Sequence, residues 1–207
     1  MQGYPGSRLW LGPLAALLLF AGILAIGLVI PGYSHVRQTV SELGEAGSPG
    51  QLAFTVLLCL VAACLGGLAT GIARTLRASA HSTLPAWFVG AMALSVAGVG
   101  LFAFPHPLHN FFGMSELVGY QAPLAAALVC RRAPALRPSA AFSIVMYALV
   151  VLALAGSLTT LDRHGAIWAF VEPVYGLVQR ALFAAWFFWC AGFAVLLMRS
   201  GRESRGQ

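Results

Sequence analysis

Six long apolar runs constrain the fold of this chain more than any other feature. They lie at residues 9–30, 52–73, 83–104, 107–130, 139–161 and 173–198. A helix needs about 20 apolar residues to cross a hydrocarbon core of roughly 30 Å, and each run is long enough. We therefore predict an all-α polytopic membrane protein, with six transmembrane helices in a single membrane domain and a polar tail at residues 199–207.

Composition supports a membrane protein over a soluble one. The chain is 59% hydrophobic and only 9% charged, whereas about 25% of the residues of a soluble domain are charged. A secretory signal peptide would have an apolar core of about 7–15 residues before a cleavage site. The first run is longer and ends at Pro31 and Gly32, so we interpret it as an uncleaved transmembrane helix.

Arginine supplies all of the basic charge, since the sequence contains no lysine. In a six-span arrangement nine arginines fall on one side and three on or near the other, which predicts cytoplasmic N- and C-termini by the positive-inside rule. They are scattered rather than gathered into a basic patch, which argues against nucleic-acid binding. An arginine-only, Ala/Gly/Leu-rich chain is typical of a GC-rich bacterium, so we expect a bacterial cytoplasmic (inner) membrane protein. The nine are Arg8, Arg74, Arg77, Arg131, Arg132, Arg137, Arg199, Arg202 and Arg205, and the three are Arg37, Arg163 and Arg180.

Three local patterns refine this architecture. Residues 31–51 are polar, with Val36, Val40 and Leu43 at helical spacing and a Thr39–Glu42 capping-box pattern, which predicts a short amphipathic helix at the membrane surface. In the second run, Gly67 and Gly71 predict close approach of another helix. In the fourth run, Pro123 predicts a kink that frees the carbonyl of Gly119.

The unusual polar residues gather on the side predicted to face outward. On the fourth run, His109, Gly113, Glu116 and Tyr120 share one helix face. An ionisable residue inside a membrane segment indicates a functional site by default, although Glu116 is close enough to the helix start to have a structural role. The candidate site residues are Ser41, Glu42, His106, His109, Glu116, Glu172 and Arg180.

Arg180 is the one arginine expected well inside an apolar run, where an unpaired charge is costly. We predict that it pairs with Glu116, Glu172 or Glu42. Either it binds an anion or a lipid headgroup through its guanidinium, or it forms a buried structural ion pair.

His106 and His109 are weak candidates for a metal site. Two histidines three residues apart can share a metal ion, but a third ligand would have to come from elsewhere, and the alternative is that both bond to the loop. A pairing of Ser41 with either histidine lacks the Gly-x-Ser-x-Gly context of a nucleophile. The four cysteines show no metal-binding spacing and are interpreted as small buried hydrophobes. We expect no cofactor.

Several short motifs resemble a bacterial membrane family, domain of unknown function 998. They are Tyr33, Thr39-Val-Ser-Glu-Leu-Gly44, Ser48-Pro49, Phe104-Pro105 followed by His109, and the step from Gly176 to Arg180. An acidic residue often follows the Phe-Pro in this family, and His106 stands there in this chain. The Ser-Glu-Leu-Gly region is also similar to a eukaryotic six-helix family of autophagy modulators and lipid-remodelling factors. The resemblance implies a six-helix fold, without an assigned activity.

Three functions are open at this level. The first is a non-catalytic protein that binds or moves a membrane lipid or small amphiphile through an outward-facing polar cavity. The second is a membrane-embedded lipid hydrolase or transferase that uses His106 and His109 as metal ligands or as bases. The third is a structural subunit in which the polar residues form an ion-pair network.

Overall fold

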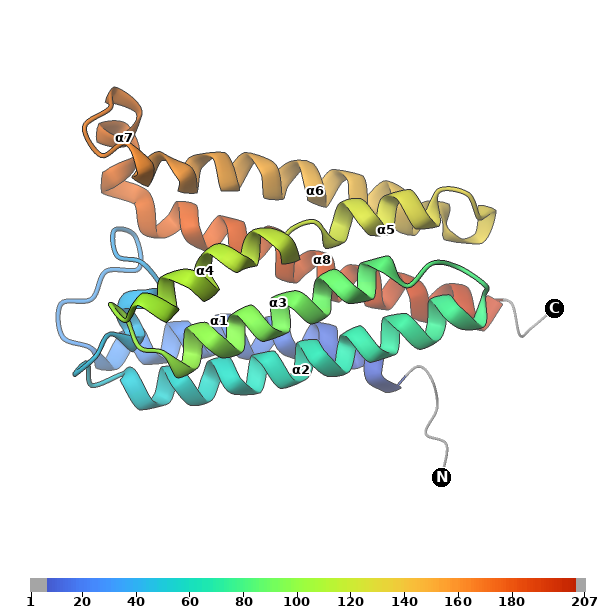
Figure 1. Cartoon of the computed structure of the whole chain (residues 1–207), viewed down its shortest axis with the longest axis horizontal. Helices are drawn as coiled ribbons and strands as arrows, with labels where there is room; N and C mark the ends of the chain where they lie inside the picture. Colours follow the sequence, from blue (N-terminus) through green and yellow to red (C-terminus); the bar gives the residue numbers. More distant parts are fainter. Residues whose placement is uncertain (1–6, 204–207) are drawn as a thin grey trace.

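The computed structural model describes residues 7–203, with side chains to Gly201, and these residues form helices joined by turns and loops (Figure 1). The all-α prediction is confirmed. The α-helices are α1 (Leu11–Val29), α2 (Gln51–Ala78), α3 (Leu84–Leu101), α4 (Pro107–Gly119), α5 (Ala122–Cys130), α6 (Arg137–Ser157), α7 (Ala166–Val171) and α8 (Tyr175–Glu203). Short 3₁₀ helices are η1 (Ser7–Trp10), η2 (Ser41–Gly44), η3 (Pro134–Leu136), η4 (Leu158–Leu161) and η5 (Glu172–Val174).

Within the described residues, five helical segments are long and apolar enough to cross a membrane: Ser7–Val29, Gln51–Ala78, Leu84–Leu101, Pro134–Leu161 and Ala166–Gly201. The predicted fourth crossing is divided into α4, of 13 residues, and α5, of 9 residues. At 1.5 Å per residue the two together extend about 33 Å, which matches one crossing. The six segments predicted from the sequence are therefore all helical, and the fourth is two helices.

The division of the fourth segment follows from Pro123, which lies in the first turn of α5. Proline has no N–H to donate to the carbonyl four residues earlier, which is that of Gly119. The indole Nε1 of Trp186 on α8 donates to this carbonyl at 3.0 Å in the buried interior. The predicted kink and the freed carbonyl are confirmed, and the structure adds the donor that satisfies it.

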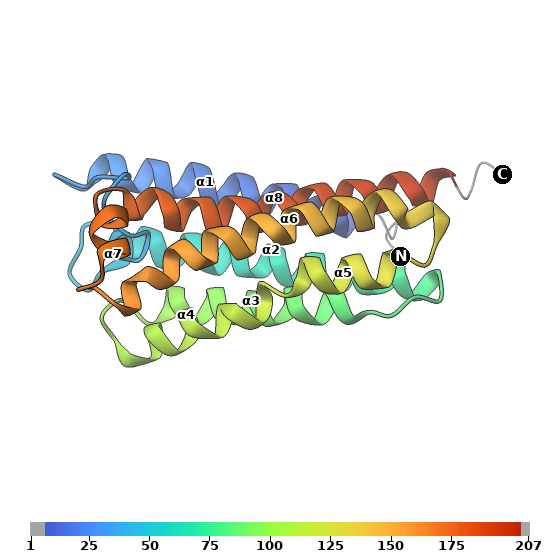
Figure 2. The ribbon, with the colours of Figure 1, turned by 90° about the horizontal axis from the view of Figure 1, so that it is seen from above.

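The crossing segments form a ring, in which each packs on its neighbours in the order α1, α2, α3, α4–α5, α6 and α8 (Figures 1 and 2). We call the end with the 31–50 loop and α7 the loop end, and the opposite end the arginine end. At the arginine end α5 packs on both α3 and α6 and closes the ring. Toward the loop end α4 packs on α3 and diverges from α6 (Figure 1).

Burial differs sharply between α8 and α6. Half of the most apolar stretch of α8 is buried, against 11% of that of α6. α8 buries Trp186, Trp189 and Phe193 in the middle of the ring, while α6 exposes large apolar residues such as Ile144 and Leu152. An exposed apolar surface of this extent fits contact with lipid rather than water.

The small residues of α2 allow close packing, as predicted. A methyl group at Gly71 would lie 3.3 Å from the backbone of Arg8 and Leu9, and one at Gly67 would meet Leu11. The start of the chain therefore lies directly on the Gly67–Gly71 face of α2.

Two predicted segments differ from the structure. In the predicted amphipathic segment 31–51, residues 31–50 form turns and the single 3₁₀ turn η2, and Gln51 begins α2, so no amphipathic surface helix forms. Val40 and Leu43 are buried whereas Val36 is exposed, because the loop folds back onto the helices rather than along the membrane surface. At the other end, α8 continues to Glu203, so the predicted tail begins as helix. The remainder of the tail, residues 204–207, lies outside the described residues.

Candidate functional site

Arg180 holds the loop after α1 onto α8. Its Nη1 donates to the carbonyls of Gln38 and Gly176, each at 2.9 Å. Its Nη2 donates to the hydroxyl of Tyr33 at 2.6 Å and lies 3.1 Å from Nδ1 of His35. All of these partners are neutral groups, so the predicted ion pair with Glu116, Glu172 or Glu42 is wrong. Three neutral groups of the loop and one carbonyl of α8 itself take the place that a carboxylate was expected to fill.

The same loop reaches α8 through three further contacts. A methyl group at Gly176 would lie 2.5–2.9 Å from the carbonyl oxygens of residues 35, 36 and 38, so only glycine lets the loop lie this close. The backbone N–H of Leu177 donates to the carbonyl of Val36 at 3.2 Å. The side-chain oxygen of Gln179 accepts from the N–H of Val40 at 2.7 Å. The step from Gly176 to Arg180 is therefore a docking face for the loop, which we call the loop anchor.

Glu42 organises the interior of the loop. One carboxylate oxygen accepts from the N–H and the hydroxyl of Thr39 at 2.8 and 2.9 Å, and the other accepts from the amide of Gln38 at 2.8 Å. The Thr39–Glu42 pattern thus forms the returning half of a capping box, in which the acidic side chain accepts a backbone N–H. Ser41 opens η2 beside it and is partly buried. Both carboxylate oxygens of Glu42 are occupied within the loop.

Burial and the nearby guanidinium set the titration of the loop residues. Burial lowers the pKa of His35, and the positive charge of Arg180 lowers it further. Because Arg180 donates toward Nδ1, the neutral ring carries its proton on Nε2, which packs over Gly27. Burial raises the pKa of Tyr33, an effect that Arg180 opposes. Both effects favour the neutral form of His35 beside the charged Arg180.

The corner between α3 and α4 accounts for the two candidate histidines separately. The Nδ1 of His106 accepts from the N–H of Leu108 at 3.1 Å and caps α4. Its ring stacks on Phe102 and is otherwise exposed. His109 is buried, and its Nδ1 lies 2.8 Å from the carbonyl of Phe102. Within residues 7–201, no three His, Cys, Asp or Glu side chains lie close enough together to hold a metal ion.

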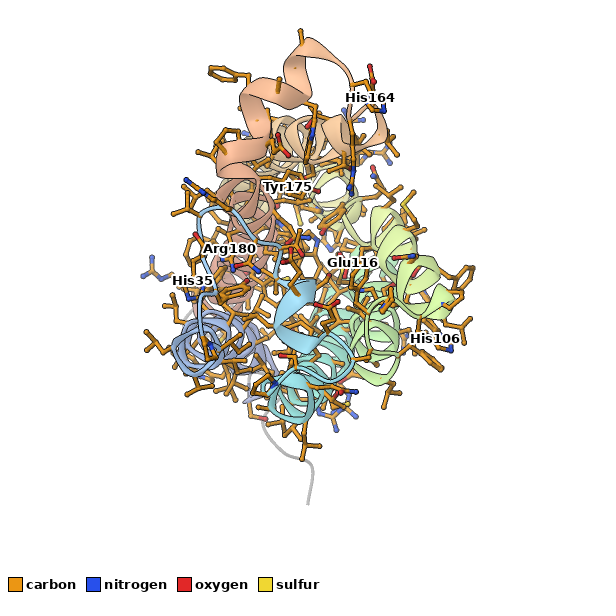
Figure 3. The ribbon with its side chains drawn as sticks, turned by 90° about the vertical axis from the view of Figure 1, so that its left-hand side faces the viewer. His35, His106, Glu116, His164, Tyr175 and Arg180 are labelled. Atoms are coloured by element: carbon orange, nitrogen blue, oxygen red, sulfur yellow. The ribbon has the colours of Figure 1, made fainter. Side chains whose placement is uncertain are left out.

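Glu116 lies on the inward side of α4, apart from the loop anchor (Figure 3). It is partly accessible, and one oxygen accepts from the hydroxyl of the buried Tyr120 at 2.9 Å. In the described chain Tyr120 is its one hydrogen-bond partner. One turn toward the loop end, a methyl group at Gly113 would meet nothing within 4 Å. The predicted shared face of Glu116 and Tyr120 is therefore present.

Two hydrogen bonds close the ring on the arginine side of Glu116. One is that of Trp186 with the carbonyl of Gly119, and the other runs from the hydroxyl of Tyr147 on α6 to the side-chain oxygen of Gln121 at 2.9 Å. Both lie at the junction of α4 and α5. Glu116 is thus on the loop-end side of a polar closure in the middle of the fourth segment.

The seven candidate residues are not one cluster. Ser41, Glu42 and Arg180 belong to the loop and its anchor, whereas His106 and His109 belong to the α3–α4 corner, and His106 points outward (Figure 3). Glu172 lies exposed in η5. Glu116 is left as the candidate whose side chain faces the bundle interior without an evident structural partner beyond Tyr120. Sequence reasoning missed Gln38, which accepts from Arg180 through its carbonyl and donates to Glu42 through its side-chain amide. Its spacing of four residues from Glu42 was the available sequence signal.

A ring of apolar helices with this exposed apolar surface defines a polytopic helical membrane protein. Residues 13–196 match the family described as "Protein of unknown function (DUF998)", and the chain belongs to that family. No curated protein and no solved structure matches the chain. The short motifs that suggested this family lie, in the structure, largely in the 31–50 loop, in the loop anchor and in the α3–α4 corner.

Proposed function

We propose that this protein binds, and in its working cycle moves, a membrane lipid or small amphiphile between the loop-end halves of α4 and α6, with Glu116 as its polar contact. The observation that carries the proposal is Glu116 itself. A charged or strongly polar side chain within a membrane segment costs up to roughly 3 kcal/mol on insertion scales. The chain supplies Glu116 with one neutral partner, Tyr120, so most of its hydrogen-bonding capacity is left for a ligand.

The arrangement of the helices supports this location. α4 packs on α3, and α6 packs on α5 and α8, so the facing sides of α4 and α6 are not held together toward the loop end (Figure 1). The exposed apolar residues of α6 at this level include Leu149 and Leu152. An acyl chain can lie along such a surface while its headgroup reaches Glu116.

The chemistry of Glu116 selects the headgroup. An ionised carboxylate only accepts hydrogen bonds. A headgroup that carries hydroxyl or ammonium donors fits it, and a bare phosphate does not. This reverses the expectation based on Arg180, because the four guanidinium contacts of that residue go to the loop and to α8.

The lipid hydrolase or transferase gains no support from the geometry. Nδ1 of His106 and Nδ1 of His109 each form a hydrogen bond with a backbone group.

We also propose that the arginine end faces the cytoplasm of a bacterium, with the loop end outside, because the arginines concentrate at one end of the ring. The site would then open to the outer leaflet.

The test is to identify amphiphiles that stay with gently purified protein by native mass spectrometry, comparing wild type with Glu116→Gln. Glutamine keeps the size of the side chain but loses the charge. We expect a specific bound amphiphile whose retention falls at least about tenfold in the variant, equivalent to roughly 1.4 kcal/mol.

The matched control is Glu172→Gln, which removes a carboxylate from an exposed position at the same end. The Glu172→Gln variant should retain the amphiphile as well as wild type does. Equal retention by all three proteins would remove the proposal, since the bound lipid would then be independent of Glu116.

A further inference from the structure

A pocket with several polar residues in its lining lies at the arginine end, far from Glu116. It has a volume of about 130 Å³ and is lined by the end of α2, by the turn between α5 and α6, and by the end of α8. One water molecule occupies about 30 Å³ in the liquid, so the pocket has room for more than one water. Its polar lining residues are Thr75, Ser79, His81 and Ser200, and Leu136 and Leu197 lie beside them.

His81 provides an unused donor or acceptor in this pocket. Its backbone N–H is satisfied by the carbonyl of Leu76 at 2.8 Å. The Nδ1 of its ring is buried and has no hydrogen-bond partner. A buried polar atom without a partner is destabilising, and a bound group that hydrogen-bonds to it removes that cost.

The charge around the pocket selects an anion. Every lining segment has arginine next to it in sequence, and these arginines are exposed: Arg74, Arg77, Arg131, Arg132, Arg137 and Arg199. The C-terminal ends of α2, α5 and α8 contribute negative poles of about half a charge each. Six cations outweigh this opposing dipole of about one and a half charges, and the described side chains of this end include no carboxylate.

We propose that this pocket binds a phosphate-bearing anion, with His81 donating from Nδ1 and the arginines holding its charge. The hydroxyls of Ser79 and Ser200 now donate to carbonyls of their own helices at 3.4 and 3.1 Å. These are long bonds, and rotation about one side-chain torsion redirects each hydroxyl. The phosphate comes either from the headgroup of a lipid in the adjacent leaflet or from a free phosphate compound in solution.

The experiment measures the melting temperature of the full-length protein in a neutral detergent with 10 mM inorganic phosphate against sodium chloride of equal ionic strength. In parallel, native mass spectrometry follows binding of phosphatidylglycerol against phosphatidylcholine. A rise of about 3 °C with phosphate supports a free-phosphate site. Selective retention of phosphatidylglycerol without a phosphate response supports the headgroup source. Absence of both effects overturns the proposal.

Two variants tie either effect to the pocket. His81→Ala should abolish it, and Ala135→Phe should block the pocket from an exposed lining position without removing a polar group. His164→Ala, an exposed histidine at the loop end, should leave it unchanged. If His81→Ala fails to fold, Ala135→Phe decides, and an undiminished effect in Ala135→Phe counts against the site. Glu116 is not involved, so this outcome is independent of the amphiphile proposal.

Discussion

The guanidinium Nη2 of Arg180 lies 2.6 Å from the hydroxyl of Tyr33, across 147 residues of sequence. Tyr33 in turn donates to the carbonyl of Thr39 at 2.7 Å. Through this relay the last helix determines the shape of the loop after the first helix. The stability of the loop end therefore depends on Arg180 more than on any other charged residue there.

Replacing Arg180 should destabilise the protein strongly. Hydrogen bonds that involve a charged group contribute about 1.5–3 kcal/mol each, so Arg180→Ala should lower the free energy of unfolding by at least about 3 kcal/mol. Tyr33→Phe, which removes one relay hydroxyl, should cost about 1–2 kcal/mol. Denaturant or thermal unfolding in detergent measures both. The exposed Arg37 of the same loop is the control, and Arg37→Ala should change stability by less than about 0.5 kcal/mol. Equal effects of the two arginine substitutions would contradict the anchor.

Gly176→Ala should displace the loop. Its new methyl group would meet three carbonyl oxygens of the loop at 2.5–2.9 Å, so the loop must move and the Arg180 contacts with it. We expect a loss of about 2 kcal/mol, in the range for overpacking. Gly66→Ala in α2 is the matched control, because its methyl group would meet nothing within 4 Å. That substitution should be neutral or stabilising by up to about 1 kcal/mol. Similar melting temperatures for the two variants would show that the loop tolerates displacement.

The carbonyl freed by Pro123 gives a double-mutant test. Trp186→Phe should cost about 1–3 kcal/mol, because the carbonyl of Gly119 is left without a donor in the interior. Pro123→Ala restores an N–H that can bond to that carbonyl. The double variant should therefore be less destabilised than the sum of the two single variants by about 1 kcal/mol. If the destabilisation of the double variant equals the sum of the two single effects, the hydrogen bond of the Trp186 indole does not depend on Pro123. That result would contradict the prediction.

The contacts of Arg180 and the break at Pro123 show what the sequence allows one to predict. Hydropathy located the crossing segments, and the chemistry of Pro123 identified the carbonyl of Gly119, because both depend on residues close in sequence. The partners of Arg180 were mispredicted because they carry no charge. Three of them, a carbonyl, a hydroxyl and an imidazole nitrogen, belong to a distant loop, and the fourth is the carbonyl of Gly176 one turn away. A search for charged partners considers only carboxylates and overlooks such groups. The amphipathic reading of residues 31–51 failed for a related reason, since contacts with α8 overrode the local spacing.

For the candidate site, the sequence placed Glu116 and Tyr120 on one helix face, because helical spacing is a local property. The sequence could not show that α4 diverges from α6 while α5 remains packed on α6, since this depends on how the three helices pack together. Nor could it separate Glu42, whose oxygens are fully used within the loop, from Glu116, whose oxygens are not.

Stability should fall in mild acid because of His35. Its pKa in the folded protein is lowered from the ordinary value by burial and by Arg180. The unfolded chain therefore binds this proton more readily, so the contribution is fully present above about pH 6.5 and is lost as the pH falls through the lowered pKa. Melting temperatures between pH 7.5 and pH 5 measure the effect. His35→Asn, which keeps an acceptor near Nδ1 but does not titrate, should show a weaker dependence on pH. An identical pH profile for the variant would assign the acid sensitivity to another group.

The most direct test of the account is the reactivity of Glu116 in native membranes toward a lipid-soluble carbodiimide, read by mass spectrometry of the modified peptide. If α4 and α6 admit amphiphiles from the bilayer, Glu116 should be modified, and the bound amphiphile should protect it. Glu42, with both oxygens occupied inside the loop, should remain unmodified under the same conditions. An unmodified Glu116 in membranes stripped of the amphiphile would show that α4 and α6 are closed to the bilayer, and would contradict the proposed function.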